Sequence, residues 1–124
     1  MTVKINGKER GFEFNVQAHK EISEHCPGND LGRMTELYEK GSEEKIQADI
    51  MVAIALNRGY EDHRHYEDPD YVPDYLTEDD FRFMHFSEIA ALEKEISSCM
   101  TKDNRISVET QPVKSSKNAK KAKA

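Results

Sequence analysis

The sequence predicts an α+β fold that is mostly α-helical, with an N-terminal β-hairpin, about four helices and a disordered, basic C-terminal tail. Three observations support this prediction. Apolar residues alternate with polar ones on both sides of Asn6-Gly7, they then recur at helical spacing to residue 100, and the pattern ends in a lysine-rich stretch. A chain of 124 residues supports one core, so we expect one domain over residues 1–102 and a flexible tail over residues 103–124.

The hairpin is predicted for the stretch TVKINGKERGFEF. Asn6 and Gly7 favour the positive φ angles that a type I′ turn requires. The alternation gives the hairpin one apolar face, formed by Val3, Ile5, Phe12 and Phe14. Because a two-stranded hairpin is marginal in water, this face must pack against the helices or against another subunit.

Two short helices are expected next. The first spans about residues 16–26, because Asn15 is a good N-cap and Pro27-Gly28 ends the pattern. Its inward stripe consists of Val16, His19, Ile22 and Cys26. The second spans about residues 31–40 and ends at Gly41. Its inward residues are Leu31, Met34, Leu37 and Tyr38.

Two longer helices complete the predicted body. The main core helix is expected over about residues 43–58, with Ser42 as N-cap and Gly59 at its end. Its inward residues are Ile46, Ile50, Ala53, Ile54 and Asn57. The last helix is expected over about residues 78–100, where Thr77 and Asp80 resemble a capping box. It carries more apolar residues than one stripe needs, so we expect part of them to bind a partner: Phe81, Met84, Phe86, Ile89, Leu92, Ile96 and Met100.

The stretch YEDHRHYEDPDYVPDYLTEDD, residues 60–80, contains nine carboxylates, two histidines and four of the five tyrosines. Pro69 and Pro73 exclude a continuous helix, so most of the stretch is predicted to be a loop that connects two helices. Two interpretations of its tyrosines remain open, because tyrosine is favoured at protein interfaces but also packs onto a protein's own body. These tyrosines are Tyr60, Tyr66, Tyr71 and Tyr75.

The residues of this stretch do not form a convincing metal site. His63 and His65 have the H-x-H spacing of a transition-metal site, but they flank Arg64 on a predicted loop, which favours a solvated loop. An EF-hand interpretation of the aspartates fails as well, because the glycine and the terminal glutamate of that motif are absent around Asp68, Asp70 and Asp74. We therefore expect no metal and no cofactor.

Catalytic motifs are also missing. Cys26 follows His25 directly, but neighbouring residues on a helix point in different directions and do not form a nucleophile–base pair. The sequence contains no G-x-S-x-G or H-E-x-x-H motif and no phosphate-binding glycine loop. The sequence therefore predicts that the protein is not an enzyme. Cys26 and Cys99 are expected to be buried thiols.

The charge distribution argues against nucleic acid as a specific ligand. Residues 1–100 carry 11 Lys or Arg against 22 Asp or Glu, whereas residues 101–124 carry seven against two. An acidic body repels phosphate, so only the tail could contact nucleic acid, without sequence specificity. The apolar runs are too short to span a membrane and no signal peptide is recognisable, so we expect a cytoplasmic protein that binds other proteins.

The N-terminal stretch VKINGKERGFEFNVQAHKEI resembles the start of the tail assembly chaperones of long-tailed bacteriophages. The shared features are a hairpin with Ile-Asn-Gly, a Phe-x-Phe return, and a helix with Ala and Ile at core spacing. The resemblance implies a non-enzymatic, mostly helical protein of the bacterial host cytoplasm that often self-associates. It would bind the tape measure protein and help to recruit tail tube subunits. Many such chaperones also have a longer, frameshifted form, for which Lys120-Lys121 is the place to inspect the codons.

A second interpretation assigns the chain to a different class, a small acidic regulator that acts as an inhibitor, an antitoxin-like binder or a nucleic-acid mimic. Both interpretations involve binding to a macromolecule. The candidate partner-binding residues are Phe12, Phe14, Tyr60, Tyr66, Tyr71, Tyr75, Phe81, Met84 and Phe86.

Overall fold

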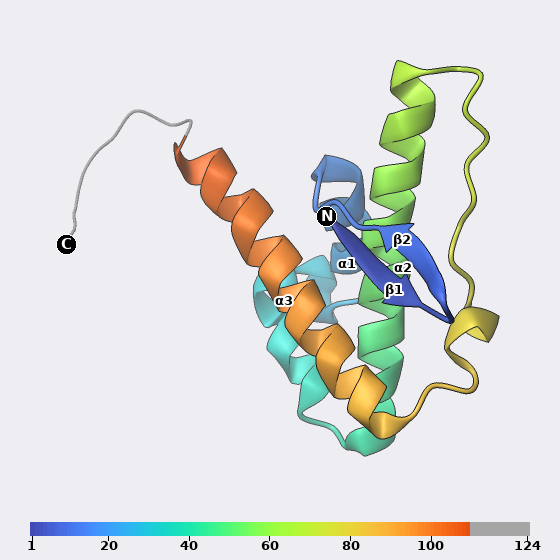
Figure 1. Cartoon of the computed structure of the whole chain (residues 1–124). Coiled ribbons are helices and arrows are strands. Elements are labelled where there is room, and N and C mark those ends of the chain that lie inside the picture. The colour runs from blue at the N-terminus through green and yellow to red at the C-terminus, as the bar shows by residue number, and fades with distance from the viewer. Residues whose placement is uncertain (110–124) are drawn as a thin grey trace.

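A computed structural model of the chain describes the backbone of residues 1–109 and the side chains of residues 1–103. The predicted fold class is confirmed, because a two-stranded antiparallel hairpin precedes a helical body. In Figure 1 the hairpin lies in front of the long helix α2, and the second long helix, α3, runs obliquely to α2. The predicted flexible tail from residue 103 begins too early, since α3 continues to Glu109. The remainder of that tail, residues 110–124, lies outside the described residues.

The hairpin has the predicted turn. Strand β1 (Thr2–Ile5) pairs with β2 (Lys8–Gly11), and Ile5 faces Lys8 across the turn. Asn6 has φ 55° and Gly7 has φ 76°, as a type I′ turn requires. Ile5 and Phe12 are fully buried, so the apolar face of the hairpin packs on the helical body of the same chain.

Helix α1 (Val16–Glu24) begins at the predicted cap, where the Asn15 side chain accepts a hydrogen bond from the Ala18 amide at 3.0 Å. It ends two residues earlier than predicted. The predicted inward stripe is wrong at Val16, which is 76% exposed, and at His19, which is also exposed. The prediction is confirmed at Ile22 and Cys26, which are buried, and Ala18 is also buried where α1 packs against α2.

The predicted second helix forms, but as a 3₁₀ helix. A short turn, η1 (Pro27–Asn29), leads into η2 (Leu31–Tyr38), which Asp30 caps by accepting a hydrogen bond from the Gly32 amide. The residues predicted to point inward are half-buried, and three of them pack against the core: Leu31, Met34 and Leu37.

Helix α2 (Ser42–Glu67) is longer than predicted and continues through Gly59 to include residues 60–67. Gly59 is therefore not a helix end. A Cβ atom at this position would lie 2.7 Å from Asn15 Oδ1 and 3.0 Å from the Glu13 carbonyl oxygen, so the glycine allows the chain before α1 to pass close to α2. The predicted cap is also displaced by one residue. Gly41 occupies the N-cap position and Ser42 is the first helical residue.

The predicted helix over residues 78–100 is divided into two helices. The capping box of Thr77 and Asp80 is present, but it starts only the 3₁₀ turn η3 (Glu78–Phe81). Helix α3 (Phe86–Glu109) has its own start, where Glu88 accepts a hydrogen bond from the His85 amide at 2.7 Å. A second acidic residue at capping distance therefore begins a new helix after the break at residues 82–85.

The core lies between the hairpin, α1, α2 and α3. Its largest fully buried side chains include Phe12, Ile5, Ile22, Leu56 and Leu92. Cys26 and Cys99 are both buried and not disulfide-bonded, as predicted. Within the described part of the chain, no helix has the length and apolar character that crossing a membrane demands.

Candidate partner-binding surfaces

The acidic stretch is divided between helix and extended chain. Residues 60–67 form the last turns of α2, and residues 68–77, called here the return segment, run back beside α2 in an extended conformation (Figure 1). Asp68 begins the reversal, because its side chain accepts from the Asp70 amide and its carbonyl accepts from the Tyr71 amide. Pro69 and Pro73 then keep the segment from continuing as helix.

Asn57 joins α2 to the hairpin and to the return segment. Its Nδ2 donates to the Gly11 carbonyl at 3.0 Å, and its Oδ1 accepts from the Leu76 amide at 2.8 Å. The side chain is fully buried, so neither backbone group can hydrogen-bond to water. The helical spacing of the sequence places Asn57 on the inward stripe of a core helix, and a polar amide at such a position is the signal that indicates a buried hydrogen-bond bridge.

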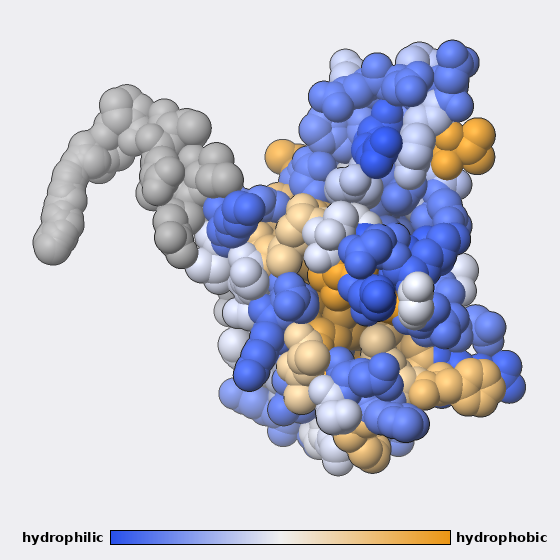
Figure 2. Space-filling model, in the orientation of Figure 1, coloured by the Kyte–Doolittle hydropathy of each residue, from blue (hydrophilic) through white to orange (hydrophobic). Residues whose placement is uncertain are grey.

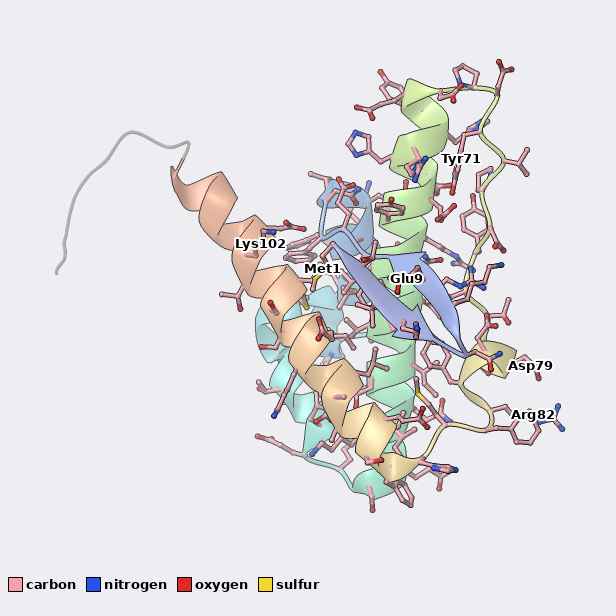
Figure 3. The ribbon with its side chains drawn as sticks, viewed as in Figure 1. Met1, Glu9, Tyr71, Asp79, Arg82 and Lys102 are labelled. Atoms are coloured by element: carbon pink, nitrogen blue, oxygen red, sulfur yellow. The ribbon has the colours of Figure 1, made fainter. Side chains whose placement is uncertain are left out.

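Glu61 has a similar role at the next turn of α2. Its Oε1 accepts a hydrogen bond from the Tyr71 hydroxyl at 2.6 Å and another from the Asp74 amide at 3.0 Å. The Tyr71 side chain extends from the return segment to α2 (Figure 3). The hydrogen bond to Glu61 raises the pKa of Tyr71, because a phenolate could no longer donate to the carboxylate.

The other tyrosines differ in their surroundings. Tyr60 packs against Gly11, where an added Cβ would lie 2.1 Å from the ring, and its hydroxyl accepts from Arg64 at 3.1 Å. The Arg64 guanidinium also stacks over the ring of Tyr71 at 4.4 Å. Tyr75 donates to Asp62, whereas Tyr66 is 82% exposed and remains available to a partner.

Basic residues of the hairpin neutralise part of the return segment. The largely buried Arg10 donates through Nη1 to the Asp74 carbonyl at 2.9 Å and lies 3.9 Å from a carboxylate oxygen of Asp80. Lys8 contacts the Asp74 carboxylate at 2.8 Å. The hydrogen bond from Lys8 is the main cause that lowers the pKa of Asp74, and the charge of Arg10 is the second. Several acids of residues 60–80 thus bind groups of their own chain.

The two histidines of the stretch have separate partners. His63 contacts Glu13 through Nδ1 at 2.9 Å and Glu67 through Nε2 at 3.2 Å. The hydrogen bond to Glu13 is the main cause of its raised pKa. His65 instead donates from Nδ1 to the Tyr71 carbonyl at 2.8 Å. Among the residues that the structure describes, no three His, Cys, Asp or Glu side chains are grouped so as to hold a metal ion.

The predicted partner-binding residues outside this stretch also differ in exposure. Phe12 and Phe81 are core residues, so a partner does not reach them in this conformation. Phe14 and Met84 are half-buried, and the Phe14 ring stacks on His19 with 5.8 Å between centroids. Phe86 is 77% exposed. Phe83, which we did not predict, is 83% exposed beside Arg82 at the break between η3 and α3.

The two buried thiols are unsuited to nucleophilic chemistry. Burial raises the pKa of Cys26, whose Sγ donates to the Ile22 carbonyl at 3.4 Å. Burial is also the main cause that raises the pKa of Cys99 to about 12. A thiol with a raised pKa holds almost no thiolate near neutral pH, and thiolate is the reactive form.

A groove with an apolar floor lies on a surface that we did not predict. This helix groove has a volume of about 600 Å³ and is bounded by α1, η2, α2 and residues 76–78. Its apolar floor is formed by the half-buried Leu37, Met51 and Ile54, and the buried Ala48 and Leu76 also line it. Its rim is formed by charged residues of both signs: Glu21, Lys40, Glu44, Arg58 and Glu78. Two of the rim residues, Arg58 and Glu21, form an ion pair of 3.2 Å.

A buried carboxyl group lies where α2 faces α3. Asp49 is 1% exposed, and neither of its carboxyl oxygens has a hydrogen-bond partner among the described residues. Burial, followed by the nearby carboxyl group of Glu93, raises the pKa of Asp49 to about 8. Burial and the neighbouring Asp49 also raise the pKa of Tyr38. At neutral pH Asp49 is therefore mainly protonated, because a carboxylate without a partner is unfavourable in the interior.

The chain matches no protein-family model, no curated protein and no solved structure.

Proposed function

We propose that the chain binds a helical segment of another protein in the helix groove and acts as a phage tail assembly chaperone, with the tape measure protein as its partner. The observation that carries the proposal is the apolar surface that the half-buried side chains of Leu37, Met51 and Ile54 present in this groove. The N-terminal resemblance supports the choice of partner, because a tape measure protein is long and helical. The protein acts by binding and not by catalysis.

The groove has the chemistry that an amphipathic helix needs. Met51 and Ile54 lie three residues apart on one face of α2 and are half-buried, as is Leu37 of η2, so part of each side chain is accessible to a partner. A partner helix recognised by such a surface presents apolar residues at positions i, i+3 or i+4, and i+7. The flexible side chain of Met51 adapts to different apolar surfaces, as a chaperone that holds many similar segments requires.

The charged rim favours a partner that is polar on its outer face. Glu44 and Glu78 flank the floor, while Lys40 and Arg58 provide positive charge at other points of the rim. Charges at the rim of an interface contribute more to specificity and association rate than to affinity. We therefore expect apolar contacts to hold the partner and the rim to fix its direction.

The structural roles of the acidic residues count against the mimic form of the alternative regulator. Glu61 and Asp74 of the 60–80 stretch bind Tyr71, Arg10 and Lys8 of the same chain. A nucleic-acid mimic would instead present its carboxylates to a basic partner.

The test is co-expression of the full chain with overlapping segments of the tape measure protein encoded in the same genome. We expect at least one helical segment to co-purify with the wild-type chain. Met51→Glu places a charge on the apolar floor and is expected to weaken binding at least tenfold in calorimetry. Gln47→Trp is a second variant, which obstructs the groove from an exposed position and does not disturb the core.

The matched control is Val72→Glu, which makes the same kind of change at a 79% exposed residue of the return segment. This control is expected to bind as the wild type does. If both groove variants also bind as the wild type does, the helix groove is not the binding site. If no segment co-purifies with the wild type, the tape measure protein is not the partner.

A further inference from the structure

The outer edge of β1 is an unpaired strand edge. The hydrogen-bonded pairs of the hairpin are Ile5 with Lys8, Val3 with Arg10 and, beyond the strands, Met1 with Phe12, whose backbone groups exchange bonds at 2.9 and 3.2 Å. The backbone groups of the alternate residues, Thr2 and Lys4, therefore point away from β2. Within residues 1–109 no other strand pairs with this edge.

A cleft lies directly beside this edge. This edge cleft has a volume of about 320 Å³ and is bounded by β1 on one side and the first half of α3 on the other. Figure 2 shows apolar side chains between the hairpin and α3. The apolar residues of the cleft are Val3, Met84, Ala91 and Leu92. An extended chain needs about 4.8 Å of separation from β1 in order to pair with it, and the cleft provides an apolar surface against which its side chains can pack.

The charges around the edge cleft are mainly negative. Glu9, Glu88 and Glu95 line it and are exposed, and Lys4 is the one basic residue among the residues that line it. Glu88 and Glu95 are seven residues apart on α3 and so lie on the same face of that helix. A segment that enters the cleft is therefore favoured by Lys or Arg and disfavoured by Asp or Glu.

We propose that the edge cleft binds an extended peptide segment of a partner protein, which adds to β1 as a third strand and carries basic residues between apolar ones. The backbone of the segment bonds to the outward groups of Thr2 and Lys4. Alternate side chains then contact the apolar residues of the cleft, and the intervening basic side chains lie near the glutamates. The strand edge thus provides the backbone contacts, and the flanking helix α3 selects the side chains of the segment.

This site is independent of the proposed tape measure site. The edge cleft and the helix groove share no lining residue, because one lies between β1 and α3 and the other between α1, η2 and α2. A chain with both sites can hold a helical segment and an extended segment at the same time. Failure of either proposal leaves the other in place.

The probe is a nine-residue peptide of alternating Val and Lys, with blocked ends and a fluorescent label, titrated into the full chain and followed by anisotropy. Lys4→Pro removes the outward amide and leaves the hydrogen bonds within the hairpin intact, since proline is tolerated at a free strand edge. Lys4→Thr is the matched control, which loses the same charge but keeps the amide. We expect Lys4→Pro to bind at least tenfold more weakly than Lys4→Thr.

A separate experiment tests the preference of the edge cleft for basic residues. Glu9→Lys combined with Glu95→Lys is expected to reverse the preference, so that an alternating Val and Glu peptide binds more tightly than the Val and Lys peptide. Equal binding of both peptides to the wild-type chain would overturn the charge complementarity. This experiment does not depend on how well the proline variant folds, and circular dichroism checks that each variant keeps its helix content.

Three further results would overturn the proposal. A peptide with the sequence of residues 110–124 carries five lysines without strict alternation, and equal binding of this peptide would show recognition by charge alone. A wild-type dimer in sedimentation experiments that dissociates in Lys4→Pro but not in Lys4→Thr would show that a second copy, and not a separate peptide, occupies the edge. Equal binding by Lys4→Pro and Lys4→Thr would exclude strand addition.

Discussion

The Asn57 side-chain oxygen accepts a hydrogen bond from the Leu76 amide at 2.8 Å, across 19 residues of sequence that include most of the acidic stretch. Because the same side chain also binds the Gly11 carbonyl, one buried residue of α2 fixes both the hairpin and the end of the return segment. The return segment is therefore fixed to the body at Leu76, although most of its residues are exposed to solvent.

Asn57→Leu is expected to lower the free energy of unfolding by about 2–4 kcal/mol. Leucine fills a similar volume but leaves the Gly11 carbonyl and the Leu76 amide buried without partners, and each such group costs about 1–3 kcal/mol. Chemical denaturation measures the change. Hydrogen exchange of the Leu76 amide gives a second readout, since loss of its acceptor is expected to speed exchange. Unchanged exchange at Leu76 would contradict the bridging role.

Gly59→Ala is expected to lower the melting temperature, although alanine favours a helix interior over glycine by about 1 kcal/mol. The added methyl group would approach Asn15 Oδ1 and the Glu13 carbonyl, and the Asn15 side chain caps α1. Thermal denaturation provides the measurement. Ser98→Ala, at an exposed position of α3, is the control and is expected to be neutral or slightly stabilising. An equal rise in melting temperature for both variants would disprove the close approach at Gly59.

Asp49→Asn is expected to stabilise the protein at alkaline pH and to flatten its stability profile. Asp49 has a folded-state pKa of about 8 against an ordinary value of 3.8, so the folded state binds more protons than the unfolded state between these values. Stability contributed by the protonated group is therefore lost as pH rises through this window. Asparagine cannot ionise, and removing the buried charge is expected to gain about 1–3 kcal/mol at pH 9.

Urea denaturation between pH 4 and pH 9 tests this prediction. Asp70→Asn, at an exposed residue of the return segment, is the matched control and is expected to leave the profile unchanged. The idea fails if Asp49→Asn and Asp70→Asn show the same pH dependence.

His63→Gln is expected to reduce the pH dependence of stability near and above pH 6.5. The hydrogen bond to Glu13, and next the charge of Glu13, raise the pKa of His63 above 6.5. This stabilisation is complete below pH 6.5 and is lost as pH rises through the folded-state pKa. NMR titration of the imidazole protons measures the pKa directly, and Glu13→Gln is expected to return it toward 6.5. An unchanged pKa in Glu13→Gln would refute the pairing.

Local signals in the sequence predicted local structure well. The Asn6-Gly7 turn, the Asn15 cap and the Thr77–Asp80 capping box are all present. Each involves residues at most three positions apart, so the interaction that stabilises the structure is contained in the stretch that predicts it. The fold class follows from the same signals together with the helical spacing of apolar residues.

Predictions from the sequence were wrong or incomplete for residues whose surroundings come from distant parts of the chain. A glycine after a run of helical apolar spacing is typical of a helix end. The role of Gly59 nevertheless depends on the chain before α1, more than 40 residues away. The tyrosines could not be assigned from the sequence either, because their surroundings depend on which acids of α2 face the return segment. The helix groove is likewise formed by four separate segments of the chain.

The sequence by itself determined a hairpin followed by a helical body, an acidic charge and buried thiols. The tertiary structure alone decided that α2 continues through Gly59, that Tyr71 and Glu61 bind each other, and that a groove and a strand edge remain open. The physical reason is the separation along the chain of the residues that interact. Turns and caps are stabilised by neighbouring residues, whereas burial, buried hydrogen bonds and clefts depend on which elements pack together.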